Sequence, residues 1–145
     1  MLIWYYYNAT SFIKIKKKIR IKMKEVNLKS IVESYENLEE SIFNKYLDYF
    51  STWISITERE DLKIIVHFLN DYIDDINVFS WFFIWFIIPQ IWKEFDLLKF
   101  WENYNINIEL KSRNVWEDRI KDQLIKNKYY LNYLPNKSYY FTFVS

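Results

Sequence analysis

The chain of 145 residues contains no glycine. Glycine is the residue that adopts positive φ angles without strain, so another residue type must form every left-handed turn, and we expect asparagine to form most of them. The phosphate-binding loops of the Walker and Rossmann types and the nucleophile elbow of hydrolases all require glycine. The sequence therefore excludes these nucleotide-binding and catalytic motifs.

The chain also lacks cysteine and has a single histidine, His67. Disulfides, zinc fingers, iron–sulfur ligation and thiol catalysis are thereby excluded. Asp74 with Asp75, and the acidic residues within 58–61, could form a carboxylate pair or bind a cation, but such groups are typical of helix flanks and caps. We expect His67 to be a packed or surface residue. The sequence thus predicts a protein that is not an enzyme and that has no cofactor and no metal.

The composition indicates where the gene resides. Glycine is absent, proline occurs twice and alanine once, whereas residues with AT-rich codons abound. Seven tryptophans break this pattern, because the standard tryptophan codon contains two G bases. A genetic code that also reads UGA as tryptophan, as in many mitochondria, removes the contradiction. This favours a protein encoded in a mitochondrion, with mycoplasma-like bacteria as the rival source; the aromatic N-terminus does not resemble a transit peptide.

The charge is segregated along the chain, although the net charge is only +1. Residues 1–24 contain seven Lys or Arg and no acid, and residues 111–145 contain seven bases against three acids. Residues 25–110 contain 16 acids against six bases. Because surfaces that face phosphate are usually basic, the two ends could contact RNA while the middle could not. An ordinary solvated surface with uneven charge is the alternative.

Residues 13–24 alternate between apolar and cationic side chains, with Lys17 the one exception. Strict alternation with β-branched residues predicts a strand that has one buried and one exposed face. Successive cations on its exposed face would lie about 6.6 Å apart. They would repel one another unless an anion neutralised them. The segment therefore indicates contact with a polyanion. Tyr139, Tyr140 and Phe141 could stack on RNA bases nearby if the two chain ends pair.

Helical spacing predicts a helix over residues 28–42, with Asn27 as its N-cap. Thr57 to Glu60 reads as a capping box that opens a second helix. Another capping box at residues 114–117 predicts a third, and a further helical stretch covers residues 92–101. Residues 105–110 and 139–144 are expected to be strands, with a turn at residues 134–137 between the last helix and the last strand.

Residues 76–92 form a long apolar run that contains Trp81, Phe82, Trp85 and Trp92. The run is shorter than the ~20 residues of a membrane span and includes polar side chains, so we expect a buried helix or a protein-contact surface formed by these four residues. Pro89 should end or kink the helix. A membrane anchor remains the open alternative.

The two basic ends resemble a known family. Lys18-Ile-Arg-Ile-Lys-Met-Lys24, followed by Val26, Asn27 and Lys29, is similar to the opening of the tenth protein of the small ribosomal subunit. Leu134-Pro-Asn-Lys137 and Phe141-Thr-Phe-Val144 resemble the turn and strand that follow in that family. The likeness covers roughly 45 residues. Here the stretch between the matched ends is several times longer, and the chain stops at Ser145 where the family continues.

The resemblance implies a structural constituent of the mitochondrial small ribosomal subunit, in the matrix, that contacts ribosomal RNA and neighbouring proteins. The expected fold is α+β, in which residues 13–45 and 113–145 form a partial ferredoxin-like sheet. A helical, acidic and aromatic-rich insertion over residues 46–112 interrupts this sheet. A separate chain could complete the domain. The positions expected to touch RNA, chiefly phosphates, are Lys16, Lys18, Arg20, Lys22, Lys24, Lys29, Asn136 and Lys137. The rival hypothesis is an accessory subunit of a mitochondrial respiratory complex, anchored in the membrane by residues 76–92.

Overall fold

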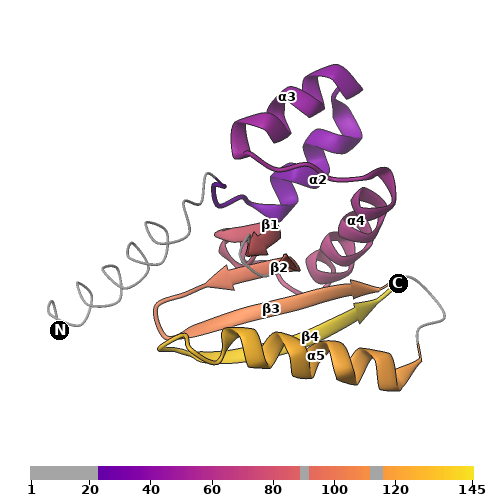
Figure 1. Ribbon diagram of the computed structural model, residues 1–145. Helices are drawn as coiled ribbons and strands as arrows, with labels where there is room; N and C mark the ends of the chain where they lie inside the picture. The colour runs from indigo at the N-terminus through magenta and orange to yellow at the C-terminus, as the bar shows by residue number, and fades with distance from the viewer. Residues whose placement is uncertain (1–22, 89–91, 112–115) are drawn as a thin grey trace, which may run out of the picture.

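The computed structural model describes residues 23–88, 92–111 and 116–145, which form an α+β fold around one mixed sheet (Figure 1). Its elements are α2 (Leu28–Asn37), α3 (Glu40–Phe50), α4 (Ile56–Asn70), the 3-10 helix η1 (Ile76–Phe79), β1 (Phe82–Ile88), β2 (Lys93–Phe100), β3 (Tyr104–Lys111), α5 (Glu117–Leu131) and β4 (Lys137–Val144). The α+β class is confirmed. The four strands lie in the order β1-β2-β3-β4, so these residues do not show a ferredoxin-like arrangement.

The helices begin close to the predicted residues, but their lengths differ from the prediction. Asn27 caps α2, since its side chain accepts a hydrogen bond from the Ser30 N–H, as expected. The single helix predicted over residues 28–42 is wrong, because the extended residue Leu38 ends α2 and α3 starts at Glu40. The capping box of α4 is formed by Ser55 and Glu58, two residues before the predicted one.

The helix predicted over residues 76–92 is also wrong. Its described part forms η1 and then strand β1, whose seven residues are buried except Ile87. A strand buried on both faces has a continuous apolar sequence, which short helices share, so periodicity could not separate the two. None of the helices in residues 23–88, 92–111 and 116–145 is long and apolar enough to span a membrane.

The helix predicted over residues 92–101 is wrong, because Lys93–Phe100 form strand β2, whereas β3, α5 and β4 fall where strands and a helix were expected. Residues 46–112 therefore supply three of the four described strands and are not mainly helical. In the sheet, β1, β2 and β3 are antiparallel neighbours. The parallel pairing of β3 with β4 requires a crossover, and α5 provides it (Figure 1).

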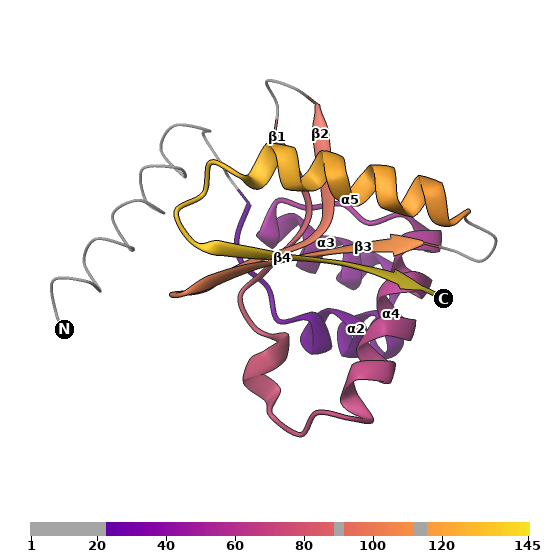
Figure 2. The same cartoon turned by 90° about the horizontal axis from the view of Figure 1, so that it is seen from below.

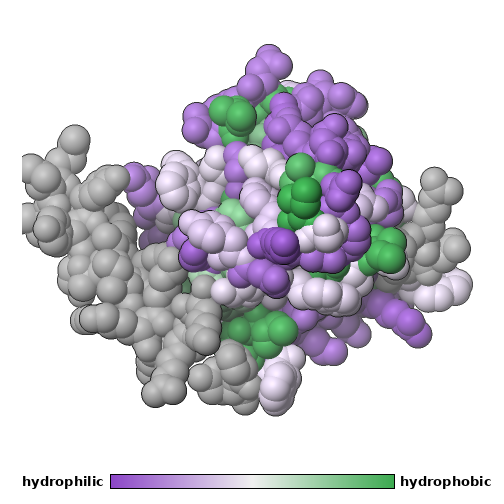
Figure 3. Space-filling model, turned by 90° about the horizontal axis from the view of Figure 1, so that it is seen from above, coloured by the Kyte–Doolittle hydropathy of each residue, from purple (hydrophilic) through white to green (hydrophobic). Residues whose placement is uncertain are grey.

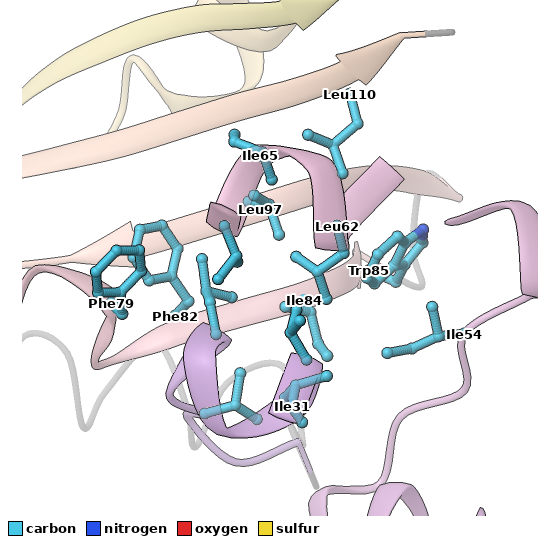
Figure 4. Packing of buried hydrophobic residues seen from close by; sticks show 14 of the residues in the cluster. Ile31, Ile54, Leu62, Ile65, Phe79, Phe82, Ile84, Trp85, Leu97 and Leu110 are labelled. Carbon is cyan, nitrogen blue, oxygen red and sulfur yellow. The ribbon is translucent and has the colours of Figure 1, made fainter. Parts of the chain in front are cut away.

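Two hydrophobic clusters cover opposite faces of the sheet. The larger lies between the sheet and helices α2, α3 and α4, and Figure 4 shows Ile84 and Leu97 of the sheet facing Leu62 and Ile65 of α4. The smaller includes Phe83, Phe86, Phe95 and Leu98 together with Leu131 of α5. Strand β1 contributes side chains to both clusters, and so joins the two layers of helices.

The N-terminal end of the described chain lies along β1, at the sheet edge opposite β4. Val26 exchanges backbone hydrogen bonds with Phe82 of β1. In register, Phe82 lies opposite Lys99, Lys99 opposite Ile106 and Ile106 opposite Tyr139. Four strand spacings of about 4.8 Å put Val26 roughly 19 Å from Tyr139. The expectation that the two ends meet as neighbouring strands is thus not met at residues 23–26; the strand predicted at 13–22 lies outside the described residues.

Left-handed backbone is placed where the sequence did not predict it. Among the described residues, the positive φ angles belong to Ser51, Trp81, Trp85 and Trp92, and none belongs to an asparagine. Ser51 occupies the C-cap of α3, a position that glycine usually takes. For a bulky residue this conformation costs about 1–2 kcal/mol, which the burial of neighbouring apolar residues must offset.

Replacing Trp81 should relieve this strain. Trp81 has a φ of 68° and is 55% exposed, so any smaller residue gives up the burial of the covered part of the indole. Asn and Val lose this burial alike, and we expect Trp81→Asn to be about 1 kcal/mol more stable than Trp81→Val, because asparagine tolerates left-handed backbone and a β-branched residue does not. Urea denaturation of the three proteins measures both changes. Equal stability of the Asn and Val variants would contradict a strained backbone at this position.

Candidate nucleic-acid interface

The structure separates the cations that the sequence placed together. Lys16, Lys18, Arg20 and Lys22 lie outside the described residues. The Lys24 ammonium lies 3.5 Å from the ring centre of Tyr49 in α3. Lys29 donates a hydrogen bond of 2.9 Å to Asn70, at the end of α4. Lys24 is thus held against α3 and Lys29 against α4, and among the described cations only Lys137 lies at the predicted site at the C-terminal end.

Asn136 has a structural role in the turn before β4. Its side-chain amide donates hydrogen bonds of 3.0 and 3.1 Å to the carbonyl oxygens of Trp101 and Glu102. Its own carbonyl accepts a hydrogen bond from the Asn105 side chain. These bonds hold the β2–β3 turn against the start of β4. They occupy the amide hydrogens that an RNA contact would have used.

Exposed aromatic rings lie beside Lys137 on β4. The Lys137 ammonium is 4.8 Å from the ring centre of Tyr139, and the Tyr104 ring packs edge-on against Tyr139 at 6.3 Å. Tyr139 is 41% exposed and Phe141 is 51% exposed. Alternation along β4 puts these two rings on the same face as Phe143, which contacts Phe68 of α4. We call Tyr104, Tyr139 and Phe141, with Lys137, the aromatic surface.

Sequence reasoning found part of this surface. It proposed Tyr139, Tyr140 and Phe141 as stacking residues, but the Tyr140 side chain points to the opposite face and packs in the cluster against α5. The strand itself was predicted, and its alternation separates Tyr140 from its two neighbours. Which of the two faces stays open depends on where the helices dock, and the sequence of β4 does not contain that information.

The helices leave β4 only partly covered. Helix α4 lies over the end of the strand near Phe143, and its Phe68 contacts Tyr72 at a ring distance of 5.1 Å. At that same end, just beyond β4, the Asp61 carboxylate accepts a hydrogen bond of 3.3 Å from the Ser145 hydroxyl, so the end is acidic. The start of β4, with Lys137, is therefore the end suited to a phosphate. The helical side of the molecule seen from above is mostly hydrophilic, with hydrophobic side chains that lie apart from one another (Figure 3).

The four aromatic residues predicted to contact other proteins divide into two pairs. Phe82 and Trp85 are buried in the large cluster of this chain, so the prediction is wrong for them, because helices of the same chain cover both faces of β1. Trp81 and Trp92 are exposed, by 55% and 83%. For these two, contact with a partner stays a prediction.

Buried polar groups gather on the α5 face of the sheet. Asn127 of α5 donates to the side chains of Asn107 and Glu109. Glu109 is also within 4.0 Å of Lys93 and 3.7 Å of Lys111. Asp96 accepts a hydrogen bond of 2.8 Å from the Leu110 backbone N–H. We call Lys93, Asp96, Glu109, Lys111 and Asn127 the polar cluster.

Burial changes the ionisation of the polar cluster. Loss of solvent around Asp96, followed by repulsion from Glu109, raises the pKa of Asp96 to about 6. Burial lowers the pKa of Lys93. Perturbed groups of this kind occur in active sites and in structural networks alike. Here Glu109 and Asn127 have partners within the chain, which favours a structural role in docking α5 on the sheet.

Neither a metal site nor a relative adds to this picture. Within residues 23–88, 92–111 and 116–145, no three His, Asp or Glu side chains gather closely enough to hold a metal ion. His67 lies on the surface, 3.1 Å from Glu36. Comparisons with protein-family models, with curated proteins and with solved structures found no match to this chain. The site must therefore be judged from its own residues.

Removing the Asp96 charge should stabilise the protein at neutral pH. A carboxyl whose pKa is raised on folding adds most to the free energy of unfolding at low pH, where it is protonated. This stabilisation is lost as the pH rises from 3.8, the ordinary pKa of the group, through about 6, its pKa in the folded protein. At 1.36 kcal/mol per pH unit the full loss is about 3 kcal/mol, and partial solvent exposure reduces it. We expect Asp96→Asn to gain about 1–2 kcal/mol at pH 7.5 and nothing at pH 4.

Thermal denaturation across this pH range measures the effect, and Asp122→Asn on the exposed side of α5 serves as the control. A loss of stability in Asp96→Asn at pH 7.5 would show that the ionised carboxylate is favourable where it lies.

Proposed function

We propose that this chain is a non-catalytic RNA-binding protein that serves as a structural constituent of the mitochondrial small ribosomal subunit. The observation that carries the proposal is the aromatic surface, in which two exposed rings lie beside a cation on one strand. Single-stranded RNA is bound in this way by many proteins, because every base can stack on an aromatic ring. The ribosomal assignment itself rests on the family resemblance of the two chain ends.

In this proposal the aromatic surface and the N-terminal cations have separate roles. Tyr139 and Phe141 stack on two unpaired bases, and Lys137 neutralises the phosphate beside them. The alternating cations of residues 14–24 neutralise further phosphates of the ribosomal RNA. These contacts set the position of the protein and read little sequence. A ferredoxin-like completion of the sheet remains part of the family hypothesis, and the four described strands do not contribute to it.

Two features of the chain support an assembly role over catalysis. Glycine-dependent catalytic loops and cysteine chemistry are excluded by the sequence. Glu109, buried between α5 and the sheet, accepts a hydrogen bond from Asn127 and lies 3.7 Å from Lys111, so its charge is already paired within the chain. Other proteins of the subunit would contact the exposed residues Trp81 and Trp92. The proposed location is the mitochondrial matrix.

The stacking role can be tested with Tyr139→Ala/Phe141→Ala. Loss of base stacking is worth about 1–3 kcal/mol per base, so affinity for a labelled oligouridine should fall at least about tenfold. Fluorescence anisotropy of a twelve-nucleotide probe measures it. Tyr129→Ala/Tyr133→Ala, which removes two exposed rings from α5 and its C-terminal end, is the matched control. Equal binding by both variants would refute a stacking surface on β4.

The N-terminal cations make a separate prediction about salt. Replacing Lys18, Arg20, Lys22 and Lys24 with Gln should weaken incorporation into the subunit and flatten the salt dependence of RNA affinity, by roughly 0.7 in the log–log slope per lost phosphate contact on single strands. Sedimentation of tagged protein with mitochondrial small subunits, at several salt concentrations, measures incorporation. Unchanged incorporation at every concentration would remove these residues from the RNA interface.

A further inference from the structure

The outer edge of strand β4 has no partner strand within residues 23–88, 92–111 and 116–145. Among the described strands only β3 pairs with it, and no described element covers its outer side when the molecule is viewed from below (Figure 2). The Ser145 N–H donates to the Lys111 carbonyl, on the β3 side. Because backbone groups alternate in direction along a strand, Ser138, Tyr140, Thr142 and Val144 direct their N–H and C=O groups outward. The edge thus offers hydrogen bonds along its whole length.

This edge carries none of the usual protection against pairing with another chain. Natural edge strands are blocked by inward charges, prolines, bulges or short length. The eight residues of β4 contain no proline, no acid and a single charge, Lys137 at its start. Its register with β3 is regular over all eight residues, without a bulge. A long, regular and nearly uncharged edge of this kind is suited to bind a further strand.

The surroundings of the edge indicate the chemistry of that strand. On one face, Tyr139 and Phe141 are exposed beside it. On the other face lies α5, whose Tyr130 packs toward the β1–β2 cluster. At 100° per residue, Lys121 and Lys128 fall on the flank of α5 opposite Tyr130, which is the flank turned away from β1 and β2. Both lysines are exposed.

We infer that the outer edge of β4 binds an extended segment of a partner protein in which acidic residues alternate with β-branched or aromatic residues. The backbone of the segment pairs with the outward groups of β4. Its apolar side chains pack beside Tyr139 and Phe141, while its carboxylates face Lys121 and Lys128. A second copy of this chain suits the edge less well, because pairing two β4 strands about a twofold axis would bring the same lysine-bearing flanks together. The backbone edge that pairs with the segment is distinct from the ring faces proposed to stack on RNA bases, although both lie beside Tyr139 and Phe141.

The probe is a nine-residue peptide of alternating valine and glutamate, with a lysine-for-glutamate peptide as its counterpart. Thr142→Pro removes one outward N–H without touching the β3 ladder, and we expect it to weaken binding of the acidic peptide about tenfold. Thr142→Val keeps that N–H and is the matched control, since the Thr142 hydroxyl is buried without a hydrogen-bond partner among the described residues. Calorimetry measures binding, and circular dichroism checks that each variant is folded.

A second pair of variants tests the charge complementarity even if the proline variant fails to fold. Lys121→Gln/Lys128→Gln should weaken the acidic peptide several-fold, whereas Lys126→Gln, on the other flank of α5, should not. The inference is overturned if the lysine peptide binds as tightly as the acidic one, or if Thr142→Pro binds the acidic peptide as tightly as the unchanged protein does. It is also overturned if the free protein sediments as a dimer and Thr142→Pro sediments as a monomer. It is equally overturned if oligouridine displaces the peptide while Tyr139→Ala/Phe141→Ala leaves RNA binding intact, because RNA would then occupy the edge itself.

Discussion

The burial of β1 on both faces is the interaction on which the rest of the fold depends. Phe82, Ile84 and Trp85 belong to the cluster under α2, α3 and α4, whereas Phe83, Phe86 and Ile88 belong to the cluster under α5. Simple alternation would put Trp85 on the α5 face. Its positive φ changes the direction of the strand, so that the indole packs with the larger cluster instead. One strand thereby holds both layers of helices on the sheet.

The two edges of the sheet differ in how they are protected, and this difference organises the surface. At β1 the edge is occupied by the Val26 bridge and by the Thr52 hydroxyl, which donates to the Ile84 carbonyl. At β4 no described strand pairs with the outer edge, and the described helices cover the aromatic face only in part. The chemistry available for binding is therefore concentrated at the C-terminal strand, next to α5, while the opposite edge is used to build the core.

A chain without glycine still needs left-handed backbone, and tertiary contacts select the residues that provide it. Serine ends α3, and tryptophans occupy the other positions in the described part of the chain. Asparagine has the better intrinsic tolerance, yet the positions are set by where a strand must turn or change face. Buried polar groups follow the same logic: Asn107 and Asn127 lie in the interior because they satisfy each other across the α5–sheet interface.

The sequence by itself determined the α+β class, the N-cap at Asn27, strand β3, helix α5 and strand β4, because capping residues and clear periodicity act over a few neighbouring positions. It also excluded glycine- and cysteine-dependent chemistry. It could not distinguish strand from helix over residues 76–101, since an apolar run buried on both faces has no period to read. Only the tertiary structure decided that Lys24 contacts α3 and Lys29 contacts α4, that Tyr140 is turned inward, and that no described strand pairs with the outer edge of β4. Each of these depends on which elements pack together across long sequence separations.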